Sequence, residues 1–280
     1  MAEAPEESAK ELLLRHGLRP KRHFGQNFLL DRRLAERIAE HAAPQGALVV
    51  EIGAGLGALT RPLLARARTV VAIERDRDLV PILRSELEAE ILSGRLIVVE
   101  TDAKRFDYAS TFSAVAPPRA LAGNLPYNLT GPLLERIGGL ASSIDRASVL
   151  VQLEVADRLV ARPGTSAYGA LTVFVQAAFG VRRALVVRRG AFHPAPDVDS
   201  ALVVLEPHAE PLALETPAFR ALVKGAFGQR RKTLRNAWSA LGDDGSLARA
   251  AKRAGIDLTL RGETLAVTDF ARMARELSAK

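Results

Sequence analysis

The chain has 280 residues, 48% of them hydrophobic and 25% charged, which is typical of a folded protein with one large domain or with one medium and one small domain. It contains no cysteine, and its five histidines are scattered, so the sequence excludes a disulfide framework and predicts no metal site. The net charge of +7 and the pI near 10.1 are typical of proteins that bind polyanions.

The N-terminal residues predict neither export nor membrane insertion. Residues 1–10 are acidic and polar, unlike a signal peptide. No apolar run reaches the roughly 18 residues that a membrane helix needs. We therefore expect a cytoplasmic protein with no membrane contact, and we expect residues 1–17 to form a flexible extension that is frayed or weakly helical.

A basic loop is expected over residues 18–29, where proline and glycine interrupt any periodicity. Its cations include Lys21 and Arg22, and they are interleaved with Phe24 and Phe28. Such a loop could bring cations to phosphates and rings to bases, so both cations are RNA-binding candidates. The alternative is a solvated loop whose two phenylalanines lie in the core.

A strand, a glycine turn and a helix follow in an order that indicates a nucleotide site. Residues 48–52 form a buried-strand pattern, residues 53–57 read Gly-Ala-Gly-Leu-Gly, and residues 59–66 have helical character. Glycines let the backbone approach a ligand, and a helix start offers free N–H groups. The spacing is not the Gly-x-Gly-x-x-Gly of dinucleotide enzymes. A tight strand-to-helix turn without a ligand is the competing interpretation.

Two acidic residues stand at the ends of the next predicted strands. Residues 69–74 form a strand that ends in Glu74, at the distance from the glycines where an acid can accept both ribose hydroxyls. After a helix over 79–92, a strand over 96–99 precedes Asp102. Asp102 could accept a hydrogen bond from an adenine amine, or it could cap a turn or helix.

A fourth strand end carries an amide, a proline and an aromatic ring. Asn124, Leu125, Pro126 and Tyr127 follow the apolar residues 120–122. Asn124 offers an amide oxygen, Pro126 holds Leu125 extended so that its carbonyl has a fixed direction, and Tyr127 offers a ring face. Two acceptors and a ring suit a nucleobase with an exocyclic amine, although these four residues taken alone favour an ordinary strand-to-loop turn.

These four strand ends predict one crevice. Ligands of open α/β sheets bind beyond the carboxyl ends of the strands. If the strands are parallel, Gly53, Glu74, Asp102 and Asn124 converge. The pattern therefore predicts an α/β, Rossmann-like sheet with helices on both faces.

The remaining sheet elements surround a rigid loop over residues 192–200. Two prolines stiffen this loop, and Phe192 leads it. Phe192 could clamp the second face of a base, or it could anchor the loop in the core. Strands are expected over 147–152, 181–188 and 201–205, and helices over 154–161 and 170–179.

The C-terminal part, residues 208–280, is expected to be a small helical RNA-binding domain after a domain that spans 18–207. From His208 onward it carries 13 Lys and Arg against 8 Asp and Glu. Arg231 and Arg235 are four residues apart, so a helix over 232–241 and its preceding turn would place them on one face. With Arg230 and Lys232 they form a candidate phosphate-binding cluster; a solvated charged face is the alternative. Other helices are expected over 219–227, 246–254 and 268–277.

Five motifs in this order resemble those of the ribosomal RNA adenine dimethyltransferases. The resemblance covers about residues 21–273, and one departure is Ala54, where the family usually has proline. The motifs are Lys21-Arg22-His23-Phe24-Gly25-Gln26-Asn27-Phe28-Leu29, Glu51-Ile52-Gly53-Ala54-Gly55, Asn124-Leu125-Pro126-Tyr127, Phe192-His193-Pro194-Ala195-Pro196-Asp197-Val198-Asp199-Ser200 and Gln229-Arg230-Arg231-Lys232-Thr233-Leu234-Arg235-Asn236.

The resemblance implies a class I methyltransferase fold and S-adenosylmethionine as cofactor. It also implies dimethylation of two adjacent adenosines near the 3' end of small-subunit (16S) RNA in an immature 30S particle, by a monomer. The target adenine would lie against Tyr127, with Phe192 near its other face, and its amine would be held by Asn124 and Leu125. The implied cofactor contacts are Asn27, Leu29, Gly53, Glu74, Asp102 and Asn124.

Two other functions stay open at this point. One is the related large-subunit RNA methyltransferase that confers antibiotic resistance, although the basic segment 229–236 fits the small-subunit enzymes better. The other is a non-catalytic ribosome assembly factor that retains the cofactor fold. A nicotinamide dehydrogenase is disfavoured by the glycine spacing and by the lack of a histidine proton relay.

Overall fold

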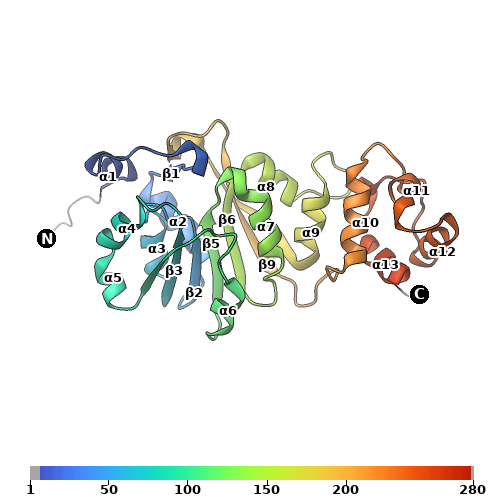
Figure 1. The fold of residues 1–280 in the computed structure, drawn as a ribbon, viewed down its shortest axis with the longest axis horizontal. Helices are drawn as coiled ribbons and strands as arrows, with labels where there is room; N and C mark the ends of the chain where they lie inside the picture. The colour runs from blue at the N-terminus through green and yellow to red at the C-terminus, as the bar shows by residue number, and fades with distance from the viewer. Residues whose placement is uncertain (1–6, 279–280) are drawn as a thin grey trace. The chain divides into compact units, whose positions relative to one another are not determined.

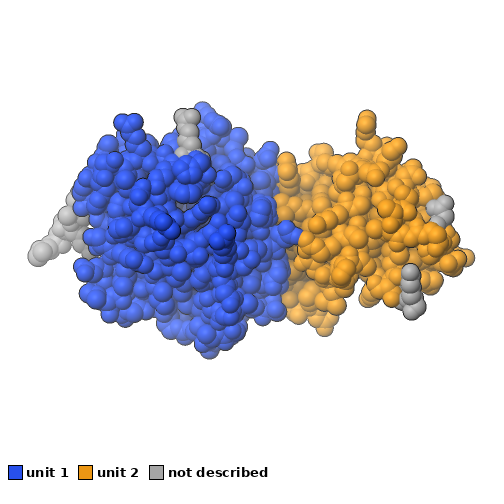
Figure 2. Space-filling model, viewed as in Figure 1, with its two compact units in different colours: residues 1–156, 182–206 blue, residues 157–181, 207–280 orange. Residues whose placement is uncertain are grey.

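The computed structural model describes residues 7–278, apart from the side chains of Arg22 and Asp244, and divides the chain into two compact units. Unit 1 comprises Met1–Ala156 and Arg182–Glu206, and unit 2 comprises Asp157–Val181 and Pro207–Lys280, as coloured in Figure 2. This division differs from the predicted boundary at 207/208. Residues 157–181 group with the C-terminal helices because their apolar side chains share that core.

The sheet of unit 1 has seven strands in the order β4-β3-β2-β5-β6-β9-β7. Strands β4, β3, β2, β5 and β6 run parallel, and β9 is antiparallel to β6. The carboxyl ends of the parallel strands therefore meet at one edge, as predicted. The strands are β2 (Leu48–Ile52), β3 (Thr69–Glu74), β4 (Leu96–Glu100), β5 (Arg119–Asn124), β6 (Arg146–Gln152), β7 (Phe179–Val187) and β9 (Ser200–Pro207).

Helices lie on both sides of this sheet, so the fold is α/β and Rossmann-like (Figure 1). Helix α2 starts where the Asp31 side chain accepts the Leu34 N–H at 3.1 Å. Its face with Ile38 and Ala42 packs with α3 and with sheet residues such as Val49. The helices are α2 (Arg32–Ala42), α3 (Thr60–Leu64), α4 (Val80–Glu86), α5 (Glu88–Leu92), α6 (Tyr108–Ser113), α7 (Thr130–Gly138) and α8 (Leu153–Leu159), with the 3₁₀ turns η1 (Arg22–Phe24), η2 (Tyr127–Leu129) and η3 (Arg189–Ala191).

The N-terminal extension contains a helix that is packed more firmly than the predicted frayed or weakly helical segment. Residues 1–6 lie outside the described residues, but Ala9–Arg15 form helix α1, which opens with a capping box between Ser8 and Glu11. Leu12 and Leu13 are only 4% and 3% exposed. The helix is ordered because these leucines bury apolar surface, which polar composition alone did not reveal.

A second, two-stranded sheet joins distant loops of unit 1. Strand β1 (Phe28–Leu29) pairs antiparallel with β8 (Phe192–His193), with Leu29 opposite Phe192. The Leu30 N–H extends the pairing by donating to the Ala191 carbonyl at 2.9 Å. The predicted loop 18–29 is thus anchored to the predicted loop 192–200.

Unit 2 is built around buried aromatic residues. Trp238, Tyr168, Phe219 and Phe270 are each fully buried in one cluster, and the Trp238 Nε1–H donates to the Leu222 carbonyl at 2.8 Å. Its elements are α9 (Ala170–Ala178), α10 (Pro217–Gly228), α11 (Leu234–Ala237), η4 (Ser239–Leu241), α12 (Asp244–Ala254), η5 (Gly262–Thr264) and α13 (Val267–Ser278).

The prediction of one helix over 232–241 is wrong. Thr233 is extended and stands before α11, and a separate 3₁₀ turn follows Trp238. Arg231 therefore lies in a turn and Arg235 in α11, so no common helix face carries them. Among residues 7–278, no helix is long and apolar enough to span a membrane.

Candidate active site

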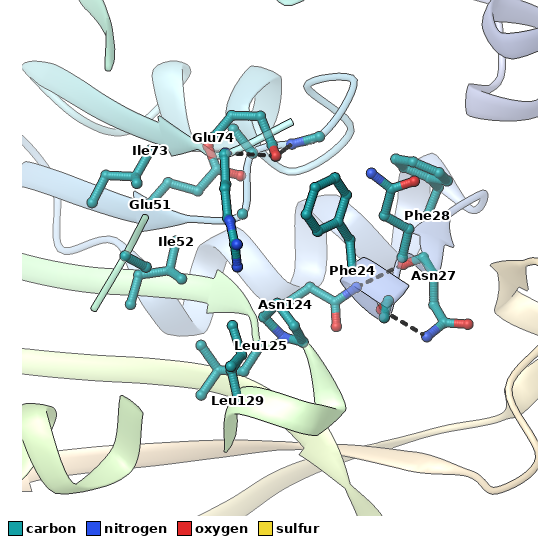
Figure 3. Close-up of a pocket in the computed structure, with 18 of the residues that line it drawn as sticks. Phe24, Asn27, Phe28, Glu51, Ile52, Ile73, Glu74, Asn124, Leu125 and Leu129 are labelled. Atoms are coloured by element: carbon teal, nitrogen blue, oxygen red, sulfur yellow. Dashed lines mark hydrogen bonds between the residues drawn. The ribbon is translucent and has the colours of Figure 1, made fainter. Parts of the chain in front are cut away.

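A pocket opens at the carboxyl edge of the parallel strands and brings the four predicted strand ends together. Gly53, Glu74, Asp102 and Asn124 all line it. Figure 3 shows Glu74 and Asn124 around the same space, with Phe24 from the N-terminal loop beside them. The convergence expected from the sequence is therefore found in the fold.

The glycine turn is shaped by backbone angles that favour glycine. Gly53 and Gly55 have φ values of 72° and 58°, in the left-handed region. A Cβ on Gly55 would lie 3.2 Å from the Phe28 ring. The turn thus brings bare backbone to the pocket wall, and Phe28 packs directly against it.

Glu74 is held by backbone donors on both of its oxygens. Oε2 accepts the Gly55 N–H at 2.8 Å, and Oε1 accepts the N–H groups of Arg75 and Asp76, both at 2.7 Å. Its side chain is 8% exposed. Burial raises the pKa of Glu74, while these backbone hydrogen bonds oppose the rise. The carboxylate is therefore fixed at the pocket wall by three backbone N–H groups.

Glu51 is a second buried acid in the pocket that the sequence reasoning did not single out. It is 1% exposed, and its Oε2 accepts the Thr60 hydroxyl at 2.6 Å. Burial raises the pKa of Glu51 to about 8, against the lowering effect of the Thr60 hydrogen bond. Its sequence signals were an acid inside an otherwise apolar strand and its place at the start of the motif over residues 51–55.

Asn124 is oriented by the N-terminal loop. Its Nδ2 donates to the Asn27 carbonyl at 2.8 Å, and the Asn27 Nδ2 donates to the Gly25 carbonyl at 3.2 Å. The preceding Gly123 is required because a Cβ there would lie 2.6 Å from the Ile52 carbonyl oxygen. With its Nδ2 committed, Asn124 keeps its oxygen as the group that can accept.

Two acceptors therefore remain at this strand end. The Leu125 N–H donates to the Leu150 carbonyl at 3.1 Å, which fixes the peptide that follows Asn124. Within the described part of the chain, no hydrogen bond ends on the Asn124 Oδ1 or on the Leu125 carbonyl oxygen. Both residues line the pocket, together with Pro126.

Tyr127 also lines the pocket and is tethered from its far end. Its hydroxyl lies 2.7 Å from the Oγ of Ser200, a fully buried residue at the start of β9. Burial raises the pKa of the Tyr127 hydroxyl, opposed by the Ser200 hydrogen bond. Ser200 is thus a positioning residue for the ring.

Phe192 does not lie in the pocket, which corrects the interpretation of this residue as a base clamp. It is 2% exposed, pairs with Leu29 across β1 and β8, and packs in a core cluster with Leu202. It is not among the residues that line the pocket. The alternative reading, a loop anchor in the core, describes this position. Asn27 and Leu29, by contrast, both line the pocket.

Lys21, a predicted RNA-binding residue, forms two ion pairs within the molecule. Its Nζ lies 2.5 Å from Asp76 and 2.6 Å from Asp78. The buried Asp76 also accepts the Gln26 Nε2–H at 2.6 Å, so it ties two points of the loop to the segment that follows β3. The Arg22 side chain lies outside what the structure describes.

Asp102 stands at the rim, next to a cation. Its Oδ1 accepts the Lys104 N–H at 2.9 Å, and its Oδ2 lies 3.4 Å from the Arg75 guanidinium. The Arg75 guanidinium carbon is also 5.2 Å from the centre of the Phe24 ring. Arg75, another residue that the sequence reasoning passed over, thus lies between the Asp102 carboxylate and the loop that covers the pocket.

The basic cluster of unit 2 divides into two kinds of residue. The Arg230 guanidinium donates to the carbonyls of Ser166 and Tyr168 at 2.9 and 3.2 Å, so it contributes to the structure of the unit. Arg231, Lys232 and Arg235 are exposed. For the described residues, no group of acidic and histidine side chains forms a metal site.

Comparison with known sequences places this site in a family. The sequence model described as "Ribosomal RNA adenine dimethylase" matches residues 17–279. The chain belongs to the ribosomal RNA adenine dimethylase family.

Several dimethylase relatives match over almost their whole length. The chain is 44% identical to the "Ribosomal RNA small subunit methyltransferase A" of Anaeromyxobacter sp. (strain K), with 96% of this chain and 98% of that protein covered. It is 45% identical to the protein of the same name from Rhodospirillum rubrum, with 96% and 92% covered.

Solved dimethylase-like structures agree on the fold. The 23S rRNA methyltransferase ErmE superposes with a TM-score of 0.67 at 29% identity, covering 90% of this chain and 99% of that chain. A dimethyladenosine transferase from Plasmodium falciparum superposes with a TM-score of 0.73 at 24% identity, covering 88% and 95%. This second likeness establishes the fold.

A member of the dimethylase family uses S-adenosylmethionine, and the chain is accordingly an S-adenosylmethionine-dependent rRNA adenine methyltransferase. The residues present fit that cofactor. A glycine turn gives backbone access, a buried Glu74 offers a fixed acceptor, and Asp102 stands at the rim. The substitution of Ala54 for the usual proline leaves the turn closed, because the Gly57 N–H donates to the Ala54 carbonyl at 2.9 Å.

Proposed function

We propose that this enzyme transfers methyl groups to the exocyclic amines of two adjacent adenosines near the 3' end of small-subunit ribosomal RNA. The relatives at 44–45% identity carry small-subunit names, whereas the large-subunit enzyme among the structures is 29% identical. The strongest structural support is the pair of unbonded acceptors at Asn124 and Leu125, beside the proposed cofactor pocket.

Five residues besides Asn124 would hold the cofactor. Glu74 would accept the ribose hydroxyls and Asp102 the adenine amine, while Gly53 lets the backbone approach. S-adenosylmethionine supplies an already activated methyl group, so the chain needs mainly to position the two reactants, which is worth up to about 7–11 kcal/mol in favourable cases. The other two residues of the set are Asn27 and Leu29.

The amine of the target base would be held by the two acceptors. An adenine amine is a weak nucleophile because its lone pair is shared with the ring. Hydrogen bonds from its two hydrogens to the Asn124 Oδ1 and the Leu125 carbonyl would turn the lone pair out of that conjugation. The Asn27 carbonyl fixes the Asn124 amide in the accepting orientation. No strongly basic side chain is required, since the acceptors act by orientation.

The base would stack on Tyr127. A base must leave its own stack to enter a pocket, which costs a few kcal/mol, and the Tyr127 ring would offset part of that cost. Because Ser200 fixes the Tyr127 hydroxyl, the ring would be pre-positioned. Pro126 would restrict Leu125 to extended geometry and so fix the direction of the Leu125 carbonyl relative to the Tyr127 ring.

A monomeric enzyme would bind and methylate the RNA while it is part of an immature 30S particle. Arg231, Lys232 and Arg235 of unit 2 are exposed cations suited to phosphate contacts. Arg230 would contribute less to these contacts, because its guanidinium donates to the carbonyls of Ser166 and Tyr168. Lys21 is similarly committed to Asp76 and Asp78.

One experiment tests the substrate. The protein is incubated with tritiated S-adenosylmethionine and either undermethylated small subunits or large-subunit RNA, and the labelled bases are mapped. We expect dimethyladenosine at two neighbouring positions of the small-subunit RNA. Label confined to large-subunit RNA would overturn the proposal, and RNA binding without any label would favour an assembly factor.

A further inference from the structure

Helix α1 packs against the outer side of the pocket wall. Leu12 and Leu13 share a small apolar cluster with Phe28, Leu56 and Leu79. Those last three residues also line the pocket. One layer of side chains therefore separates the N-terminal helix from the space that the cofactor would occupy.

Phe28 connects this helix to the glycine turn. Its ring is 8% exposed and lies so close to Gly55 that a Cβ there would approach two ring carbons to 3.2 and 3.3 Å. The Gly55 N–H in turn donates to Glu74. A shift of the Phe28 ring would therefore displace the glycine turn, and with it the Glu74 carboxylate that is proposed to hold the ribose.

Both ends of the helix are closed by local hydrogen bonds, and one ion pair ties it to α4. At its start, the Ser8 N–H donates to the Glu11 carboxylate at 2.7 Å, which completes the capping box. At its end, the Leu18 N–H donates to the Leu13 carbonyl at 2.9 Å. Arg15 forms an ion pair with Glu86 of α4. The first two bonds stabilise the helix itself, and the ion pair attaches it to α4.

We propose that α1 is a buttress of the cofactor pocket and that Leu12 and Leu13 are positioning residues for cofactor binding. They hold Phe28 against the Gly53–Gly57 turn, and the turn presents Glu74. This inference rests on the proposed assignment of the pocket to S-adenosylmethionine and adds a role for residues 9–15. Loss of the two leucines would loosen the pocket wall while the seven-stranded sheet keeps its own core, because the helix belongs to a separate cluster.

The test compares Leu12→Ala/Leu13→Ala with Leu14→Ala in the full chain. Leu14 is the next residue of the same helix but is 69% exposed. The measurements are the Kd for S-adenosylhomocysteine by calorimetry and the KM and kcat for S-adenosylmethionine. We expect the double variant to bind about tenfold more weakly and to raise KM more than it lowers kcat, whereas Leu14→Ala stays within about twofold.

Two further variants separate the possible results. Leu12→Val, a milder change, replaces the double variant if the latter does not fold, and we expect a smaller rise in Kd in the same direction. Unchanged Kd in the folded leucine variants overturns the buttress. Glu74→Gln tests the pocket itself. If it binds as the wild type does, the cofactor assignment fails, whereas lost binding in Glu74→Gln with wild-type binding in the leucine variants removes only the role of α1.

Discussion

The side-chain amide of Asn124 donates to the backbone carbonyl of Asn27 across 2.8 Å, joining residues 97 positions apart in the chain. The N-terminal loop therefore sets which end of that amide faces the pocket. Because the nitrogen is occupied, the oxygen is the end left to accept from a substrate amine. Any change that moves the loop should alter the amide as well.

Asn124→Ala removes one acceptor and should abolish most of the methylation. We expect kcat to fall by about 100-fold or more, because the amine loses a positioning contact, while RNA binding persists. Single-turnover methyl transfer and RNA filter binding measure the two effects. Asn128→Ala is the matched control, since Asn128 lines the same pocket but is exposed and donates to the His23 carbonyl. Equal activity in wild type and Asn124→Ala would contradict the assigned role.

Asp76→Ala should release the N-terminal loop. The Asp76 carboxylate accepts from both Lys21 and Gln26 and is 2% exposed. We expect a loss of about 1–3 kcal/mol in the free energy of unfolding and a higher KM for S-adenosylmethionine, measured by urea unfolding and initial rates. Asp78→Ala removes only a partly exposed partner of Lys21 and serves as the control. A variant that loses stability but keeps its KM would show that cofactor binding does not depend on this tether.

Phe192 should behave as a core residue. Phe192→Ala is expected to lower the free energy of unfolding by about 3–5 kcal/mol, whereas Phe192→Leu keeps most of the packing and should cost less than about 1.5 kcal/mol. Denaturant unfolding and kcat of both variants provide the check. If Phe192→Leu were stable yet about 100-fold slower, the ring would have to contact the base after all.

Glu51 should make stability depend on pH. Burial raises the pKa of Glu51 in the folded protein to about 8 from an ordinary value of 4.5, so between these values the folded state keeps a proton that the unfolded state loses. The stability linked to Glu51 is thus complete below pH 4.5 and is lost as the pH rises towards 8. Glu51→Gln removes this dependence. The free energy of unfolding of the variant, relative to that of the wild type, should therefore rise between pH 4.5 and pH 8.

Urea unfolding of the protein without cofactor at several pH values checks this expectation. Glu88→Gln, at an exposed position on α5, should follow the wild-type curve. Parallel curves for wild type and Glu51→Gln would show that Glu51 is ionised in the folded state at neutral pH.

The exposed cations of unit 2 should carry salt-dependent RNA binding. Arg231→Ala and Arg235→Ala are each expected to weaken RNA binding. Each should also reduce the slope of log K for RNA binding against log salt concentration by about the amount that one phosphate contact contributes. Arg230→Ala should instead lower stability, since its guanidinium bonds to two backbone carbonyls. Binding at several salt concentrations is the measurement, with Lys252→Ala on α12 as the charge-matched control. An unchanged slope in the first two variants would place the RNA contacts elsewhere.

The strand ends could be predicted from the sequence because their signals are local. Apolar runs ending in Gly53, Glu74 and Asn124 indicate both a strand and the polar group at its tip, and parallel pairing then brings the tips together. The helix cap at Asp31 is of the same local kind, since its side chain accepts the N–H of Leu34, three residues on.

Other features depend on partners far away in the chain. Nothing near Phe192 tells whether its ring faces a base or Leu29, because the pairing of β1 with β8 decides it. The acid Asp76 looks like any loop residue until Lys21 and Gln26 reach it. The order of α1 likewise depends on Phe28 and Leu56, which its own sequence does not reveal.

The chain contributes to unit 2 twice, through 157–181 and again from 207 onward. Helix α9 lies in the first stretch, and its Phe174 meets Phe219 of α10 edge-on at 6.1 Å between ring centres. A protein truncated after residue 206 would therefore carry an orphaned apolar helix and should aggregate. Exchange of unit 2 between relatives would therefore require both stretches to be transplanted together, because they share one core.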